Sequence, residues 1–183
     1  MMKLFKVLIG CTPKGRHIEQ HDICFGIATS IKNMIPQLQE FWPEVANTMH
    51  VDAYRAITSV DGYAVNIVPL QEELTSEAKL FFINLGSYKP GDFEEYHYKM
   101  IVAATDKGKA VQHAKQSAFY KHTGFKGAES HIDDKYGIDV DDVYAIEDIL
   151  PASLKSEYKI VLQRQDNLPE DELHLGYFQL KKL

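Results

Sequence analysis

The feature that most constrains the fold of this chain is a repeat within its own sequence. The segment "KLFKVLIGCTPKGRHIEQHDICFGIAT", which starts at Lys3, aligns without a gap with "KLFFINLGSYKPGDFEEYHYKMIVAAT", which starts at Lys79. In this alignment one position in three is identical, and Glu19 and His21 meet Glu95 and His97. Identical charged and aromatic residues in the same order indicate two copies of one structural unit.

A second block repeats further along the chain, at a slightly larger offset. "HVDAYRAITSVDGYAV", from His50, aligns with "HIDDKYGIDVDDVYAI", from His131, with six identities. We therefore expect a first repeat over residues 3–69, a second over 79–150, and a C-terminal β-hairpin over 151–183 that completes the sheet. A repeat of about 70 residues buries only a marginal core alone, so the two are expected to pack as one body with pseudo-twofold symmetry.

Each repeat reads as strand, strand, helix and strand. In the first, residues 4–10 are apolar and form a strand that Gly10 is expected to end, and residues 21–29 form the next strand with Phe25 on its buried face. Asp106 is expected to cap the helix of the second repeat. The fold class predicted is α+β, a tandem duplication of a ββαβ(β) unit with a mostly antiparallel sheet.

Composition narrows the classes of partner. The net charge is −6, which argues against nucleic acid and against an anionic membrane. The two cysteines, Cys11 and Cys24, are too few for a disulfide framework and are expected to be free and buried. The N-terminal apolar run is interrupted by lysines and reads as a strand, and no segment is long enough to span a membrane. A cytoplasmic protein is expected.

Polar residues recur in each repeat at the spacing that places two side chains on one face of a strand. Residues i and i+2 of a strand share a face, so Glu-x-His and His-x-Asp each present an imidazole beside a carboxylate. If the two strand ends meet, each repeat gathers two of each group. The candidate ligand-binding residues are Glu19, His21, His50, Asp52, Glu95, His97, His131 and Asp133.

Two chemistries suit these clusters. Two histidines with a carboxylate suit zinc, iron or manganese, so the same eight residues are the candidates for a divalent metal site. Without a metal, a carboxylate can orient a histidine that acts as a general acid or base. Neither a phosphate-binding glycine loop nor a nucleophile motif is present, so the sequence leaves open whether the chain is an enzyme.

The combination of G…E-x-H, F/I-x-x-A-[TS] and H-[VI]-D, present twice, resembles an uncharacterised bacterial family, domain of unknown function 1543. The resemblance runs from about Lys3 to Ile149. It implies a bacterial origin and one or two copies of the domain, and it carries over no activity.

Two functions from different classes are therefore compared. In the first, the duplicated clusters bind a small molecule or a metal ion. In the second, the chain is a non-catalytic structural or interaction module, in which the duplication serves to bury a sheet face or to build a homodimer. The distance between His21 and His50 discriminates between them, because a shared site requires the two imidazoles to meet.

Overall fold

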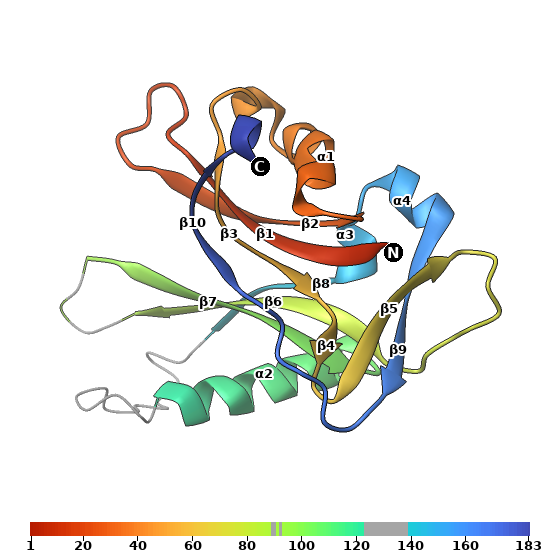
Figure 1. The fold of residues 1–183 in the computed structure, drawn as a ribbon. Coiled ribbons are helices and arrows are strands. Elements are labelled where there is room, and N and C mark those ends of the chain that lie inside the picture. The colour runs from red at the N-terminus through yellow and green to blue at the C-terminus, as the bar shows by residue number, and fades with distance from the viewer. Residues whose placement is uncertain (89–90, 92, 123–138) are drawn as a thin grey trace. The chain divides into compact units, whose positions relative to one another are not determined.

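The computed structural model describes residues 1–88, 91, 93–122 and 139–183. The chain forms two compact units (Figure 1). Unit 1 contains Met1–Thr75 together with Ile149–Leu183, and unit 2 contains Ser76–Asp148. Both are mixed α and β, with strands that pair antiparallel and few helices, as the sequence predicts for the fold class.

The larger sheet of unit 1 has four strands in the order β10-β3-β1-β2. They are β1 (Lys3–Cys11), β2 (Gln20–Ala28), β3 (His50–Ile57) and β10 (His174–Gln179). β1 is one of the two inner strands, and it is apolar along most of its length and mostly buried. β2 begins with the exposed triplet Gln20-His21-Asp22 and is buried from Ile23 onward, so its polar end projects beyond the core.

A short helical segment covers one face of this sheet. It consists of η1 (Ile31–Met34), α1 (Ile35–Phe41) and η2 (Pro43–Val45). Met34 and Leu38 are fully buried and belong to one apolar cluster with Val7, Ile9 and Val51. Pro36 lies in the first turn of α1, where its missing N–H costs nothing.

A second sheet in unit 1 has the order β4-β5-β9, formed by β4 (Ser59–Val60), β5 (Tyr63–Pro69) and β9 (Tyr158–Arg164), with α4 (Ala152–Glu157) before β9. Asp61 and Gly62 join β4 to β5 with φ of 50° and 78°. Two positive φ values define the tight hairpin turn that the Asp-Gly pair predicts.

Unit 2 has a three-stranded sheet in the order β7-β6-β8, formed by β6 (Lys79–Tyr88), β7 (Glu95–Ala104) and β8 (Asp139–Ala145). α2 (Lys107–His122) packs on it through Ala110 and Ala114, which are fully buried among Phe81, Ile83 and Val102. α3 (Ile146–Ile149) follows β8.

Two expectations about strands are wrong. The last two strands do not form a hairpin, because β9 pairs with β5 in one sheet and β10 pairs with β3 in the other. Gly10 does not end the first strand, since β1 continues to Cys11 and Gly10 pairs on both sides. Length and hydropathy gave no information on which earlier strand each C-terminal strand would join.

Phe25 tests the prediction that β2 has a buried face at this residue. It is 3% exposed on β2, so Phe25→Ala is expected to lower the free energy of unfolding by about 3–5 kcal/mol. Phe41→Ala is the matched control, because this ring is 45% exposed and its loss should cost under about 1 kcal/mol. Urea denaturation of both variants measures the difference; equal losses would contradict the assignment.

Asp106 caps α2 as predicted, accepting a hydrogen bond from the Lys109 backbone N–H at 2.9 Å. This bond holds the pKa of Asp106 below its ordinary value. A carboxyl group whose pKa is lower in the folded state than in the unfolded state stabilises the folded state when the pH is above the unfolded-state pKa. This stabilisation is lost as the pH falls through the folded-state pKa. Asparagine also caps helices but does not titrate in this range.

Thermal denaturation followed by circular dichroism tests this cap. Between about pH 5 and pH 3, the wild type is expected to lose more stability than Asp106→Asn, because only the wild type loses its charged cap. Parallel pH profiles for the two proteins would show that the carboxylate does not stabilise the helix.

Candidate functional site

The site in unit 1 is built on Gly10, in the middle of three paired strands. Gly10 pairs with His21 on β2 and with His50 on β3. A Cβ atom at Gly10 would lie 2.5 Å from Asp52 Oδ2, 2.9 Å from His50 Nε2 and 3.0 Å from His21 Cδ2. Only glycine leaves room for these three side chains to close over the strand.

A β-bulge in β3 places the carboxylate of Asp52 over Gly10. Ile9 pairs with Val51 and Leu8 with Ala53, so Asp52 is an extra residue in β3 with no partner on β1. Bulges of this kind re-aim a side chain and often lie beside functional sites. Here the bulge turns the Asp52 carboxylate over Gly10, between the two imidazoles.

Four side chains form a closed ring in which imidazoles and carboxylates alternate. His50 Nε2 lies 3.1 Å from Glu19 Oε1 and 3.1 Å from Asp52 Oδ1. His21 Nε2 lies 3.3 Å from Asp52 Oδ2 and 3.7 Å from Glu19 Oε2. The structure therefore brings Glu19 and His21 together with His50 and Asp52, which is the meeting of strand ends that a shared site requires. We call these four residues the His–carboxylate ring.

The ring is partly open to solvent. The side chain of His50 is 6% exposed and that of Asp52 25%, whereas those of His21 and Glu19 are 40% and 43% exposed. The ring of Tyr177, on β10, lies over His50 with its centroid 4.2 Å away and the planes tilted by 32°. His50 and Asp52 thus form the floor of the site, and His21 with Glu19 forms its outer rim.

Hydrogen bonding within the ring is incomplete. Each Nε2 atom carries at most one proton, so the two imidazoles can donate two hydrogen bonds from these atoms to four carboxylate oxygens. Asp52 Oδ2 is buried and has no hydrogen-bond partner in the described part of the chain, although His21 Nε2 is 3.3 Å from it. The site has more acceptors than donors.

The ring is not a completed metal site. Among residues 1–88, 91, 93–122 and 139–183, no group of three or more His, Cys, Asp or Glu side chains could hold a metal ion as it stands. The imidazole nitrogens of the ring instead lie at close to hydrogen-bond distances from carboxylates. A metal ion would have to displace the ring protons and spread the ligands around itself.

Unit 2 repeats part of this arrangement. His97 pairs with Gly86, and its Nε2 lies 3.8 Å from Glu95 Oε2. Its Nδ1 lies 3.3 Å from Asn84 Nδ2. Glu95 and His97 are the two candidates of the second repeat that the structure describes. His131 and Asp133 lie outside the described residues.

The register of β8 corrects the predicted counterpart of His50. Gly86 pairs with Asp139 on β8, as Gly10 pairs with His50 on β3. The sequence alignment had instead matched His50 with His131. The alignment followed side-chain identity across a region of unequal length, whereas the pairing of backbone groups fixes which residue lies beside the glycine.

Two features of the site were missed by the sequence reasoning. Gly10 was interpreted as a strand end, although a glycine that recurs as Gly86 in the second repeat was a signal of close packing over the strand. Tyr177 belongs to the last strand of the chain, far from His50 in sequence, and no motif connects it to the ring.

The cysteines do not contribute chemistry to the site. Cys11 and Cys24 are free and buried, as predicted. Burial, assisted by the nearby Asp22 carboxylate, raises the pKa of Cys24 to about 12. The thiolate is the reactive form of cysteine, so the Cys24 thiol is inert at neutral pH.

Comparisons with known proteins support the fold and leave the function open. Residues 16–67 match the model of a Domain of Unknown Function, DUF1543. The crystal structure of a protein Il1583 from Idiomarina loihiensis is similar, with a TM-score of 0.67 and 21% sequence identity over 98% of this chain and 99% of that chain. No curated protein matches the sequence. No helix in the described ranges is both long and apolar enough to cross a membrane.

Gly10→Ala tests the packing over β1. The added methyl group must push Asp52 and His50 away, which is expected to cost about 1–3 kcal/mol in the free energy of unfolding. Gly108→Ala is the control: its Cβ would meet only the Asp106 carboxylate at 3.3 Å, and alanine favours a helix. A Gly10→Ala protein as stable as the wild type in urea would contradict this packing.

Proposed function

We propose that unit 1 binds a positively charged group at the His–carboxylate ring. The observation that carries the proposal is the alternation of two imidazoles and two carboxylates over Gly10, with N–O distances of 3.1–3.7 Å and too few protons to satisfy four oxygens. A cation supplies the missing charge and removes the repulsion between the carboxylates of Glu19 and Asp52.

Two kinds of cation share this chemistry. A protonated amine needs only the carboxylate oxygens and donates up to three hydrogen bonds to them. A divalent metal ion would use the imidazole nitrogens as well. Four ligand atoms about 2.0–2.1 Å from a tetrahedral ion lie about 3.3 Å from one another, so the four side chains would have to rearrange from the closed ring into a tetrahedron around the ion.

Thermal denaturation in the presence of separate cations tests the proposal. The probes are zinc chloride, manganese chloride and butylamine hydrochloride, with choline chloride as a cation that has no N–H donor. At 100 times its dissociation constant, a ligand that binds only the folded state stabilises it by about 2.7 kcal/mol. Asp52→Asn keeps the shape of the side chain, removes one negative charge and is expected to abolish the stabilisation.

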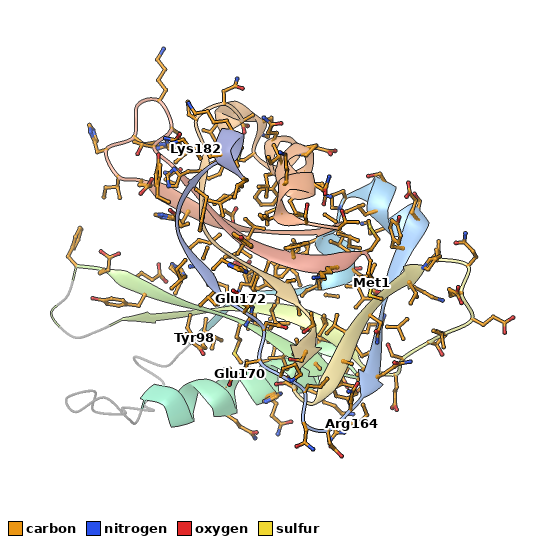
Figure 2. The ribbon with its side chains drawn as sticks, viewed as in Figure 1. Met1, Tyr98, Arg164, Glu170, Glu172 and Lys182 are labelled. Atoms are coloured by element: carbon orange, nitrogen blue, oxygen red, sulfur yellow. The ribbon has the colours of Figure 1, made fainter. Side chains whose placement is uncertain are left out.

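The matched control is a second histidine–carboxylate pair in the same unit. His174 Nε2 lies 3.7 Å from Glu172 Oε2, and Glu172 is labelled in Figure 2. Glu172→Gln is expected to leave the response to cations unchanged. Stabilisation by zinc or manganese alone identifies a metal site, and stabilisation by butylamine alone identifies an amine site.

The alternative is that the ring is structural and the chain is an interaction module. In that case no cation changes the melting temperature, and the double variant His21→Ala with His50→Ala unfolds. That pair of results would overturn the proposal. A folded double variant that no longer responds to a cation which stabilises the wild type would support it.

We also propose that the two units arose by tandem duplication, with repeats over 3–69 and 79–150. The support is that the strand pairings correspond. Gly10 pairs with His21 between β1 and β2 as Gly86 pairs with His97 between β6 and β7, and the bulge opposite Leu8 and Ile9 recurs opposite Asn84 and Leu85. A cytoplasmic location, a bacterial origin and self-association remain predictions from the sequence.

A further inference from the structure

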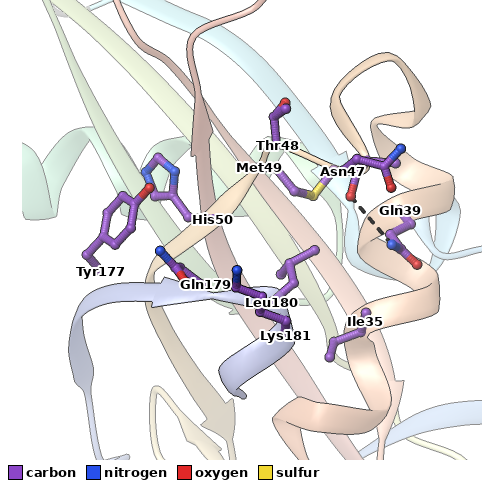
Figure 3. A pocket seen from close by; sticks show the side chains of 11 residues that line it. Ile35, Gln39, Asn47, Thr48, Met49, His50, Tyr177, Gln179, Leu180 and Lys181 are labelled. Carbon is purple, nitrogen blue, oxygen red and sulfur yellow. Dashed lines mark hydrogen bonds between the residues drawn. The ribbon is translucent and has the colours of Figure 1, made fainter.

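A pocket of 470 Å³ opens in unit 1 next to His50 (Figure 3). Its walls come from α1, from the loop that precedes β3, from β10 and from η3 (Leu180–Lys182). Gln39 Nε2 donates a hydrogen bond to the carbonyl oxygen of Ala46 at 3.4 Å, which ties α1 to the loop. The volume lies within the range of small-molecule sites, about 300–1,000 Å³.

The charge of this pocket is opposite to that of the His–carboxylate ring. Lys181 provides a fixed positive charge, and the amides of Gln39, Asn47 and Gln179 with the hydroxyl of Thr48 provide uncharged hydrogen-bonding groups. The described residues that line the pocket include no aspartate or glutamate. Glu19, His21 and Asp52 do not belong to its lining, so His50 is the one member of the ring that it shares.

The remaining walls of the pocket are apolar. Ile35, Met49 and Leu180 line it, and the ring of Tyr177 closes the side next to His50. Met49 is 4% exposed and Leu180 packs against the same core cluster, so these two residues form the buried part of the wall, whereas Tyr177 is 66% exposed and forms its rim. A ligand with an apolar body would bury that body here, while a charged end reaches the polar residues.

We propose that this pocket binds a small organic acid, with its anionic end at Lys181 and its apolar part against Met49, Leu180 and Tyr177. A carboxylate and a phosphate monoester share the required chemistry. This proposal goes beyond the cation site proposed for the His–carboxylate ring, because the ligand is an anion and most of the residues that would bind it are different. His50 links the two sites.

Backbone amide NMR of the full chain, titrated with defined probes, tests the pocket. The probes are hexanoate and phenyl phosphate; hexanamide and inorganic phosphate are controls that lack the charge or the apolar part. At least one organic acid is expected to cause saturable shifts at residues 46–50 and 177–181. It should bind about tenfold or more tightly than hexanamide, because a hydrogen bond to a charged donor is worth at least that factor.

Two lysine variants separate the pocket from general surface charge. Lys181→Gln is expected to reduce the affinity for the acid to that of hexanamide. Lys182→Gln, at the neighbouring position labelled in Figure 2, is expected to leave it unchanged, because Lys182 does not line the pocket. The tighter of the two acids identifies whether carboxylate or phosphate is recognised.

Four results would overturn this inference. The first three are the absence of saturable binding, equal affinity for hexanoate and hexanamide without tight phenyl phosphate binding, and an unchanged affinity in Lys181→Gln. Inorganic phosphate binding as tightly as phenyl phosphate would also overturn it, because the apolar wall would then have no role. None of these results depends on whether cations bind the ring, so the two proposals fail separately.

Discussion

The absence of a side chain at Gly10 is the constraint on which the site depends. β1 lies between β2 and β3, and its antiparallel pairing brings His21 from one neighbour and His50 from the other against the same residue. Any Cβ atom there would occupy the space in which Asp52 Oδ2 and His50 Nε2 lie. The bulge in β3 then directs the Asp52 side chain toward the two histidines, where regular strand pairing would not place it.

The His–carboxylate ring is locally unfavourable, because it places two carboxylates close together and leaves a buried oxygen without a hydrogen bond. Buried polar atoms are normally paired, and carboxylates are normally kept apart unless a cation lies between them. Here Met34, Leu38 and Val51 fill the helix-covered side of the sheet, which fixes the strands under the ring. Conflicts of this kind are expected where a protein binds something, because the ligand then satisfies the groups that the fold leaves unsatisfied.

Much of the fold and the four residues of the His–carboxylate ring could be predicted from the sequence, whereas the roles of Gly10 and Tyr177 could not. Apolar runs located β1 and β2, and the i, i+2 rule placed Glu19 with His21 on one face. Register could not be predicted in the same way. Asp139 pairs with Gly86 as His50 pairs with Gly10, and this correspondence depends on backbone hydrogen bonds between distant strands. The positions of β9, β10 and Tyr177 were inaccessible for the same reason.

The most direct test of the account is whether His21 and His50 respond as one site. Long-range ¹H–¹⁵N NMR spectra of the histidine side chains, recorded during a titration with zinc chloride and separately with butylamine, report on each imidazole. One of these cations is expected to shift the His21 and His50 signals along a common saturation curve, while His174, which stacks on Tyr54, does not respond. Signals of His21 and His50 that saturate at different concentrations, or that remain unmoved by both cations, would contradict it.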